Sequence, residues 1–103
     1  TLRGVPQRPI WITEMGFFVS RSRYGVSEQR QATLLADTMD FIKRRLTDTP
    51  FGQGNRALPA NVQRVYWFAL DDYPMPDDYG NFGLYRADRT PRASAETLRR
   101  LIQ

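Results

Sequence analysis

Apolar residues gather in four segments of the chain, separated by polar connections that contain proline or glycine. Segments 9–14 (PIWITE) and 62–70 (VQRVYWFAL) are rich in β-branched and aromatic residues, which favours β-strands. In segments 27–46 and 91–102 the apolar residues recur with helical spacing. The pattern therefore predicts the order strand, helix, strand, helix.

End signals support both predicted helices. Ser27 is a good N-cap, and Glu28 follows it in the first turn. Residues 43–45 (KRR) place cations in the last turn, where the helix dipole favours them. Thr90 is expected to cap the second helix, with Pro91 at its first position. The apolar positions that we expect the helices to bury are Leu35, Met39, Ile42 and Leu46 in the first and Leu98, Leu101 and Ile102 in the second.

The first strand is apolar on both faces, as in a parallel strand that is covered on both sides. Two parallel strands joined by a helix form a right-handed βαβ unit. Ligands of such folds bind beyond the carboxyl ends of the strands. The informative connections here are those that follow Glu14 and Leu70.

Side-chain alternation suggests which residues meet at these strand ends. Glu14 lies on the opposite face to Trp11, and Trp67 on the opposite face to Tyr66. If Trp11 and Tyr66 pack on helices, Glu14 and Trp67 point together to the other side. A carboxylate beside an indole face is typical of carbohydrate sites, where the ring packs on sugar C–H bonds.

Each candidate residue has an alternative role. Glu14 could be a strand-end surface carboxylate, or it could cap the turn through the amides of Gly16 or Phe17, and Trp67 could be plain core. Phe17 could line a sugar cleft or anchor its loop.

Two aspartates follow the second strand. Asp71 and Asp72 could hydrogen-bond sugar hydroxyls, or pair with Arg86 or Arg89 and hold the loop. With Asp77 and Asp78 they offer hard oxygen ligands for calcium, but their spacing matches no EF-hand.

Three motifs now carry a family resemblance. The stretches PIWITEMG, VYWFALDD and GNFGLYRADRTPRASAETLRRLI resemble the seventh and eighth strand–helix units of clan A (β/α)8 glycoside hydrolases. The resemblance implies a βαβα piece of a TIM barrel, with residues 1–103 as one C-terminal portion of a catalytic domain. It implies that Glu14 is the nucleophile of a retaining enzyme and Trp67 the floor of a sugar subsite. It also implies a non-proline cis peptide after Trp67.

The chain departs from that family in its second carboxylate. Retaining glycosidases need an acid/base about 5 Å from the nucleophile, and in this clan it usually follows an asparagine on the fourth strand. The chain has no Asn-Glu pair, and Glu28 and Glu96 fit helix surfaces. A complete barrel needs about 250 residues, whereas this chain has 103. We therefore expect the chain alone to be inactive, and the alternative function is a non-catalytic carbohydrate-binding or inactive barrel fragment.

Composition narrows the chemistry further. The chain has no cysteine and no histidine, so acid–base chemistry rests on carboxylates or tyrosines, and we expect no metal and no cofactor. The net charge is +4 with scattered arginines and no nucleic-acid motif, which leaves a basic interaction module as a third function class. Because no nucleic-acid motif accompanies the charge, we expect no nucleic acid as a partner. No apolar run approaches a membrane span, so we expect no membrane partner either.

Two strands and two helices cannot close a barrel. An inner face formed by Ile10, Ile12 and Val65 would be exposed, and both strand edges would be open. We expect the remainder of a barrel or a homo-oligomer partner to cover that face. The other expected partner is a carbohydrate substrate.

Overall fold

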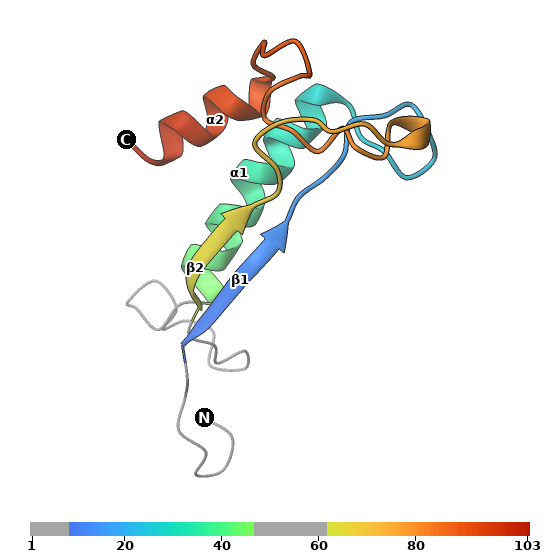
Figure 1. Cartoon of the computed structure of the whole chain (residues 1–103). Helices are drawn as coiled ribbons and strands as arrows, with labels where there is room; N and C mark the ends of the chain where they lie inside the picture. The colour runs from blue at the N-terminus through green and yellow to red at the C-terminus, as the bar shows by residue number, and fades with distance from the viewer. Residues whose placement is uncertain (1–8, 47–61) are drawn as a thin grey trace.

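The predicted order of elements is confirmed by the computed structural model, which describes residues 9–46 and 62–103 (Figure 1). Within these residues it contains two strands, two α-helices and one short 3₁₀ helix. In chain order these are β1 (Ile10–Met15), α1 (Glu28–Arg45), β2 (Val62–Trp67), η2 (Pro76–Asp78) and α2 (Ala93–Leu101). Strand β2 ends at Trp67, earlier than the predicted end at residue 70.

The predicted N-cap of α1 is confirmed and that of α2 is wrong. The Ser27 hydroxyl accepts a hydrogen bond from the Arg30 amide at 3.0 Å. Helix α2 begins at Ala93 with Arg92 as its N-cap, because the Thr90 amide and hydroxyl both donate to Asp88 Oδ1. Thr90 is therefore part of the turn that precedes the helix.

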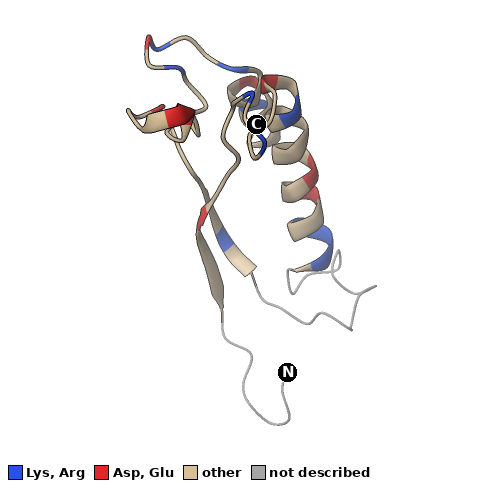
Figure 2. Ribbon diagram, turned by 90° about the vertical axis from the view of Figure 1, so that its right-hand side faces the viewer, with Lys and Arg blue, Asp and Glu red and all other residues tan. Residues whose placement is uncertain are grey.

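Strands β1 and β2 are parallel neighbours in a two-stranded sheet. Helix α1 lies behind the sheet in Figure 1 and to one side of it in Figure 2, and β2 lies to the left of β1 in Figure 1. This arrangement is the right-handed crossover expected of a βαβ unit. The register shifts twice, once after Ile10 pairs with Val62 and again before Met15 pairs with Trp67.

The sheet face that turns toward α1 is not the predicted one. The amide of Val62 donates to the carbonyl of Leu46 at the end of α1, so β2 starts against the helix and Val62 is buried. Val62 and Val65 line a cavity of about 450 Å³ together with residues of α1 and α2. The residues that the helices contribute include Met39, Ile42, Leu98 and Ile102.

The opposite face carries an exposed aromatic cluster, formed by Trp11, Tyr66 and Arg64. The rings of Trp11 and Tyr66 lie 6.5 Å apart, and the Arg64 guanidinium lies 5.0 Å from the Trp11 ring. Trp11 is 54% and Tyr66 46% exposed. The prediction that Trp11 and Tyr66 pack on helices is therefore wrong. On the face that we expected to be exposed, Ile10 is 44% exposed as predicted, whereas Ile12 and Val65 are half-buried, and Val65 lines the cavity beside the helices. Strict alternation does not hold along these strands, because their register shifts after Ile10 and again after Ile12.

The helices pack on each other through their N-terminal halves. Leu35 and Ile42 of α1 are buried as predicted, and Met39 is half-buried. Leu101 and Ile102 of α2 are exposed, contrary to the prediction, because α2 runs away from α1 toward its C-terminus (Figure 1). Two buried polar residues, Gln31 and Ser94, lie where the helices meet.

The exposed aromatic cluster gives a prediction for the chain in solution. An exposed sheet face with two open edges favours association, so we expect purified residues 1–103 to self-associate. Tyr66→Lys should shift the mass in sedimentation velocity toward the monomer. Tyr24→Lys is the matched control, since Tyr24 is an exposed loop aromatic outside the sheet. A monodisperse wild-type monomer would contradict the prediction.

Candidate functional site

Glu14 and Trp67 lie at the carboxyl ends of two adjacent parallel strands, as predicted. Glu14 is the penultimate residue of β1, and Trp67 is the last residue of β2. The register pairs Met15 with Trp67 after an irregularity that begins at Ile12, so simple alternation does not hold as far as Glu14. Their convergence on one face therefore stays a prediction.

The Glu14 side chain is exposed. Among the described residues no hydrogen bond or ion pair involves its carboxylate, and none joins it to the amides of Gly16 or Phe17. No contact in the described part of the chain therefore supports the turn-capping alternative for Glu14. An exposed and unpaired carboxylate at a strand end fits the surface-carboxylate alternative and is also accessible to a ligand.

Trp67 is half-buried against the loop that follows β1. Its ring lies 5.9 Å from the ring of Phe17, at an angle of 44°. Its indole Nε1 is buried and, within the described residues, is the one buried side-chain nitrogen or oxygen without a hydrogen-bond partner. An unsatisfied buried donor costs about 1–3 kcal/mol, and such groups in native structures call for a functional or structural explanation.

Gly16 explains how the two strand ends approach so closely. A Cβ at this position would lie 1.9 Å from the carbonyl oxygen of Phe68, which leaves room for glycine alone. The Phe68 amide donates to the carbonyl of Met15 and extends the pairing past the strand ends. The cis peptide lies between Phe68 and Ala69, so the predicted position after Trp67 is wrong by one residue.

Loop aromatics anchor the loops beyond the strand ends. Phe18 packs on Tyr79 and Phe82, and Phe68 packs on Phe82 and Tyr73, with ring centroids 5.3–5.8 Å apart. Phe17 contributes its ring to Trp67 and its carbonyl to a hydrogen bond from Gln31. Of the two roles considered for Phe17, these contacts support the anchoring of its loop.

Asp72 holds the loop after β2, and its partner is Arg92 instead of Arg86 or Arg89. Arg92 Nη1 and Nη2 donate to the two carboxylate oxygens at 2.6 and 2.8 Å, and the Gly83 amide donates to Oδ1 at 2.9 Å. The side chains of Arg92 and Asp72 are 5% and 9% exposed. Little of the Asp72 carboxylate is left for a sugar.

The same arginine reaches the start of α1. Arg92 Nε donates to Glu28 at 2.9 Å, and Arg86 donates to both oxygens of Glu28 at 3.0 and 2.7 Å. The hydrogen bond from Arg86, and after it that from Arg92, lower the pKa of Glu28 despite the opposing effect of burial. Bonding to Asp72 raises the pKa of Arg92 further. These four side chains, Glu28, Asp72, Arg86 and Arg92, form the ion-pair network.

Asp71 differs from its neighbour. Its backbone is bridged to Tyr85, and its half-buried carboxylate makes no hydrogen bond or ion pair with another described residue. Of the two aspartates, Asp71 is therefore the one that can still bind a ligand. The four loop aspartates do not gather, since no group of three or more acidic residues in the described parts of the chain is placed to hold a metal.

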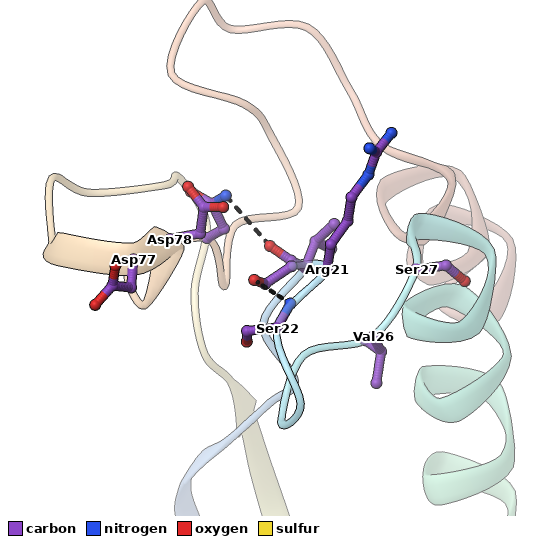
Figure 3. Close-up of a pocket in the computed structure, with 9 residues that line it drawn as sticks. Arg21, Ser22, Val26, Ser27, Asp77 and Asp78 are labelled. Atoms are coloured by element: carbon purple, nitrogen blue, oxygen red, sulfur yellow. Dashed lines mark hydrogen bonds between the residues drawn. The ribbon is translucent and has the colours of Figure 1, made fainter.

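A second hollow opens between the loops, and Figure 3 shows the residues that line it. Its volume is about 580 Å³. Asp77 and Asp78 lie on one side, opposite Arg21, Ser22 and Ser27. The hydrogen bonds between Val19 and Asn81 join the two walls. The sequence did not predict this hollow, because its walls come from two loops far apart along the chain.

Comparison with known proteins adds no relative. No protein-family model matches the chain, and neither the curated proteins nor the solved structures give a significant match. Within residues 9–46 and 62–103, neither helix combines the length and the apolar character of a membrane span. The glycoside hydrolase resemblance therefore stays a prediction from the motifs.

The ion-pair network predicts unequal costs for two arginine substitutions. Arg92→Met leaves the buried Asp72 carboxylate without its charged partner, which typically costs about 3–5 kcal/mol. Arg99→Met is the matched control, because it breaks only the exposed pair with Glu96, worth about 0–1 kcal/mol. Urea unfolding at neutral pH measures both. Equal midpoints for the two variants would contradict the assigned role of Arg92.

The lowered pKa of Glu28 predicts a pH dependence. The stabilisation from ionised Glu28 is fully present above its unfolded-state pKa of about 4.3 and is lost as pH falls through the lower folded-state pKa. The stability advantage of wild type over Glu28→Gln should therefore be constant near neutral pH and shrink below about pH 4.3. Urea midpoints from pH 7 to pH 3 test this, with Glu96→Gln as the exposed control. An advantage that is independent of pH would contradict it.

Proposed function

We propose that this chain supplies the nucleophile and part of the sugar subsite of a retaining O-glycoside hydrolase, as the seventh and eighth strand–helix units of a complete (β/α)8 barrel. The observation that carries the proposal is the placement of Glu14 and Trp67 at the carboxyl ends of adjacent parallel strands in a right-handed βαβ unit. That end of the strands is where barrels of this kind bind their substrates.

The local chemistry supports this reading. In the proposed reaction a Glu14 oxygen attacks the anomeric carbon, the bond to the leaving oxygen breaks, and water later hydrolyses the glycosyl–enzyme. The Glu14 carboxylate is exposed and unpaired among the described residues, so a substrate can reach it. The half-buried ring of Trp67, fixed by Phe17, offers an apolar surface for a sugar ring.

The acid/base is assigned to the remainder of the barrel. The chain has two other glutamates: Glu28 is held by Arg86 and Arg92, and Glu96 is paired with Arg99. The arginine partners of Glu28 hold the pKa of its carboxyl group below the usual range, and an ionised carboxylate cannot protonate a leaving group. The Glu96 side chain is exposed on α2 beside Arg99.

A second candidate function is non-catalytic carbohydrate binding. It is favoured by the ion pairs of the two other glutamates, Glu28 and Glu96, because glutamates that serve in ion pairs are not available as an acid/base. In that case Trp67 and Asp71 keep their binding roles, and Glu14 becomes a hydrogen-bonding group. The two functions differ in the expected effect of removing the Glu14 charge: it should abolish turnover by a hydrolase but leave sugar binding by a non-catalytic module in place.

A chimaeric barrel separates the two candidates. The chain is fused behind the first six strand–helix units of a clan A enzyme that retain their acid/base, and 4-nitrophenyl glycosides are assayed. We expect turnover in a folded chimaera and a loss on the order of 10⁶-fold in kcat for Glu14→Gln, as for removal of a nucleophile elsewhere. Glu96→Gln is the matched control and should retain activity.

The chain alone should not turn over the same substrates, because it has no Asn-Glu pair to supply the acid/base that the resemblance places on the fourth strand. A folded, active chimaera that keeps its activity in Glu14→Gln would exclude Glu14 as the nucleophile. Binding of the glycosides without turnover, unchanged in Glu14→Gln and lost in Trp67→Ala, would favour the carbohydrate-binding function.

A further inference from the structure

Two fully buried polar side chains lie behind the strand ends. Gln31 is in the first turn of α1, Ser94 is in the first turn of α2, and both are 0% exposed. Gln31 lies four residues before Leu35, on the stripe that the helix buries. Burying an amide among apolar side chains is unfavourable unless its hydrogen bonds are satisfied, so the partners of Gln31 define its role.

Gln31 joins three segments of the chain. Its Nε2 donates to the carbonyl of Phe17 at 3.0 Å, and its Oε1 accepts a hydrogen bond from the Ser94 hydroxyl at 2.7 Å. The hydroxyl donor and the carbonyl acceptor together fix which end of the amide faces the loop. Phe17 is thereby held from behind at its backbone.

The residue that Gln31 holds is the link between the two strand ends. Phe17 follows Glu14 by three residues, and its ring packs on Trp67. Gly16, between them, lies against the Phe68 carbonyl without room for a Cβ. Movement of the Phe17 carbonyl therefore displaces the surface on which the Trp67 ring rests.

We propose that Gln31 is a positioning residue of the strand-end site, which fixes the Trp67 ring through Phe17 while Ser94 orients its amide. The role in a sugar site rests on the proposed function, whereas the mechanical link from Gln31 to Trp67 does not. Catalysis and binding both require groups that are held in place by surrounding packing and hydrogen bonds.

Tryptophan fluorescence reports on this link directly. The chain has two tryptophans, so Trp11→Phe leaves Trp67 as the sole emitter. In this background Gln31→Met should shift the Trp67 emission to longer wavelength and reduce its protection from acrylamide. It should also lower the urea midpoint, because it leaves the buried Ser94 hydroxyl unpaired. Gln29→Met, at an exposed position of the same helix, is the matched control and should change none of these.

A double variant separates positioning from plain stability. Gln31→Met with Ser94→Ala replaces both members of the buried Gln31–Ser94 hydrogen bond by apolar groups, which can be nearly neutral for that pair. The Phe17 carbonyl still lacks its Gln31 donor, which keeps the proposed loss of positioning in this variant. We expect the urea midpoint to recover toward wild type while Trp67 stays exposed to acrylamide. Recovery of both would show that Gln31 is only structural and would overturn the proposal, as would an unchanged Trp67 in Gln31→Met.

If Gln31→Met does not fold, the double variant alone tests the proposal. It has no unpaired Ser94 hydroxyl, and its Trp67 fluorescence can still be compared with that of wild type. Native protection of Trp67 in that variant overturns the link. Failure of the proposed function would appear elsewhere, as an active chimaera that is indifferent to Glu14→Gln. The two failures are therefore distinguishable.

Discussion

The buried guanidinium of Arg92 is the contact on which the upper half of this fold depends. It bonds Glu28 at the start of α1, Asp72 after β2 and the carbonyl of Gly83, while its own amide donates to Leu84. These segments are far apart in the sequence, and the chain has no disulfide to join them. A buried guanidinium is unfavourable unless it is paired. The start of α1, the loop after β2 and the segment at Gly83 are therefore ordered together around Arg92.

The elements of this fold were predictable because their signals are local. The β-branched run of β1, the Ser27 cap of α1 and the cations at its end all act within a few residues. The side of the sheet that faces α1 was not predictable, since two register shifts alter the alternation on which that inference depended. The prediction that Thr90 caps α2 was also wrong, because the Thr90 amide and hydroxyl donate to the Asp88 carboxylate, two residues earlier.

The candidate site, like the fold, could be predicted only in part from the sequence. The positions of Glu14 and Trp67 at the strand ends followed from the order of the elements. The supporting residues, Arg92, Gln31 and Ser94, were missed because each is explained by partners distant in sequence. One of them did leave a signal: Gln31 is a polar residue on the apolar stripe of α1, where a buried amide needs a dedicated partner.

The close approach at Gly16 has a consequence for how this fold can change over generations. With the Phe68 carbonyl where a methyl group would have to be, every mutation of that glycine to another residue must push the strand ends apart. The distance between the ends of β1 and β2, where Glu14 and Trp67 lie, is therefore tied to this single glycine.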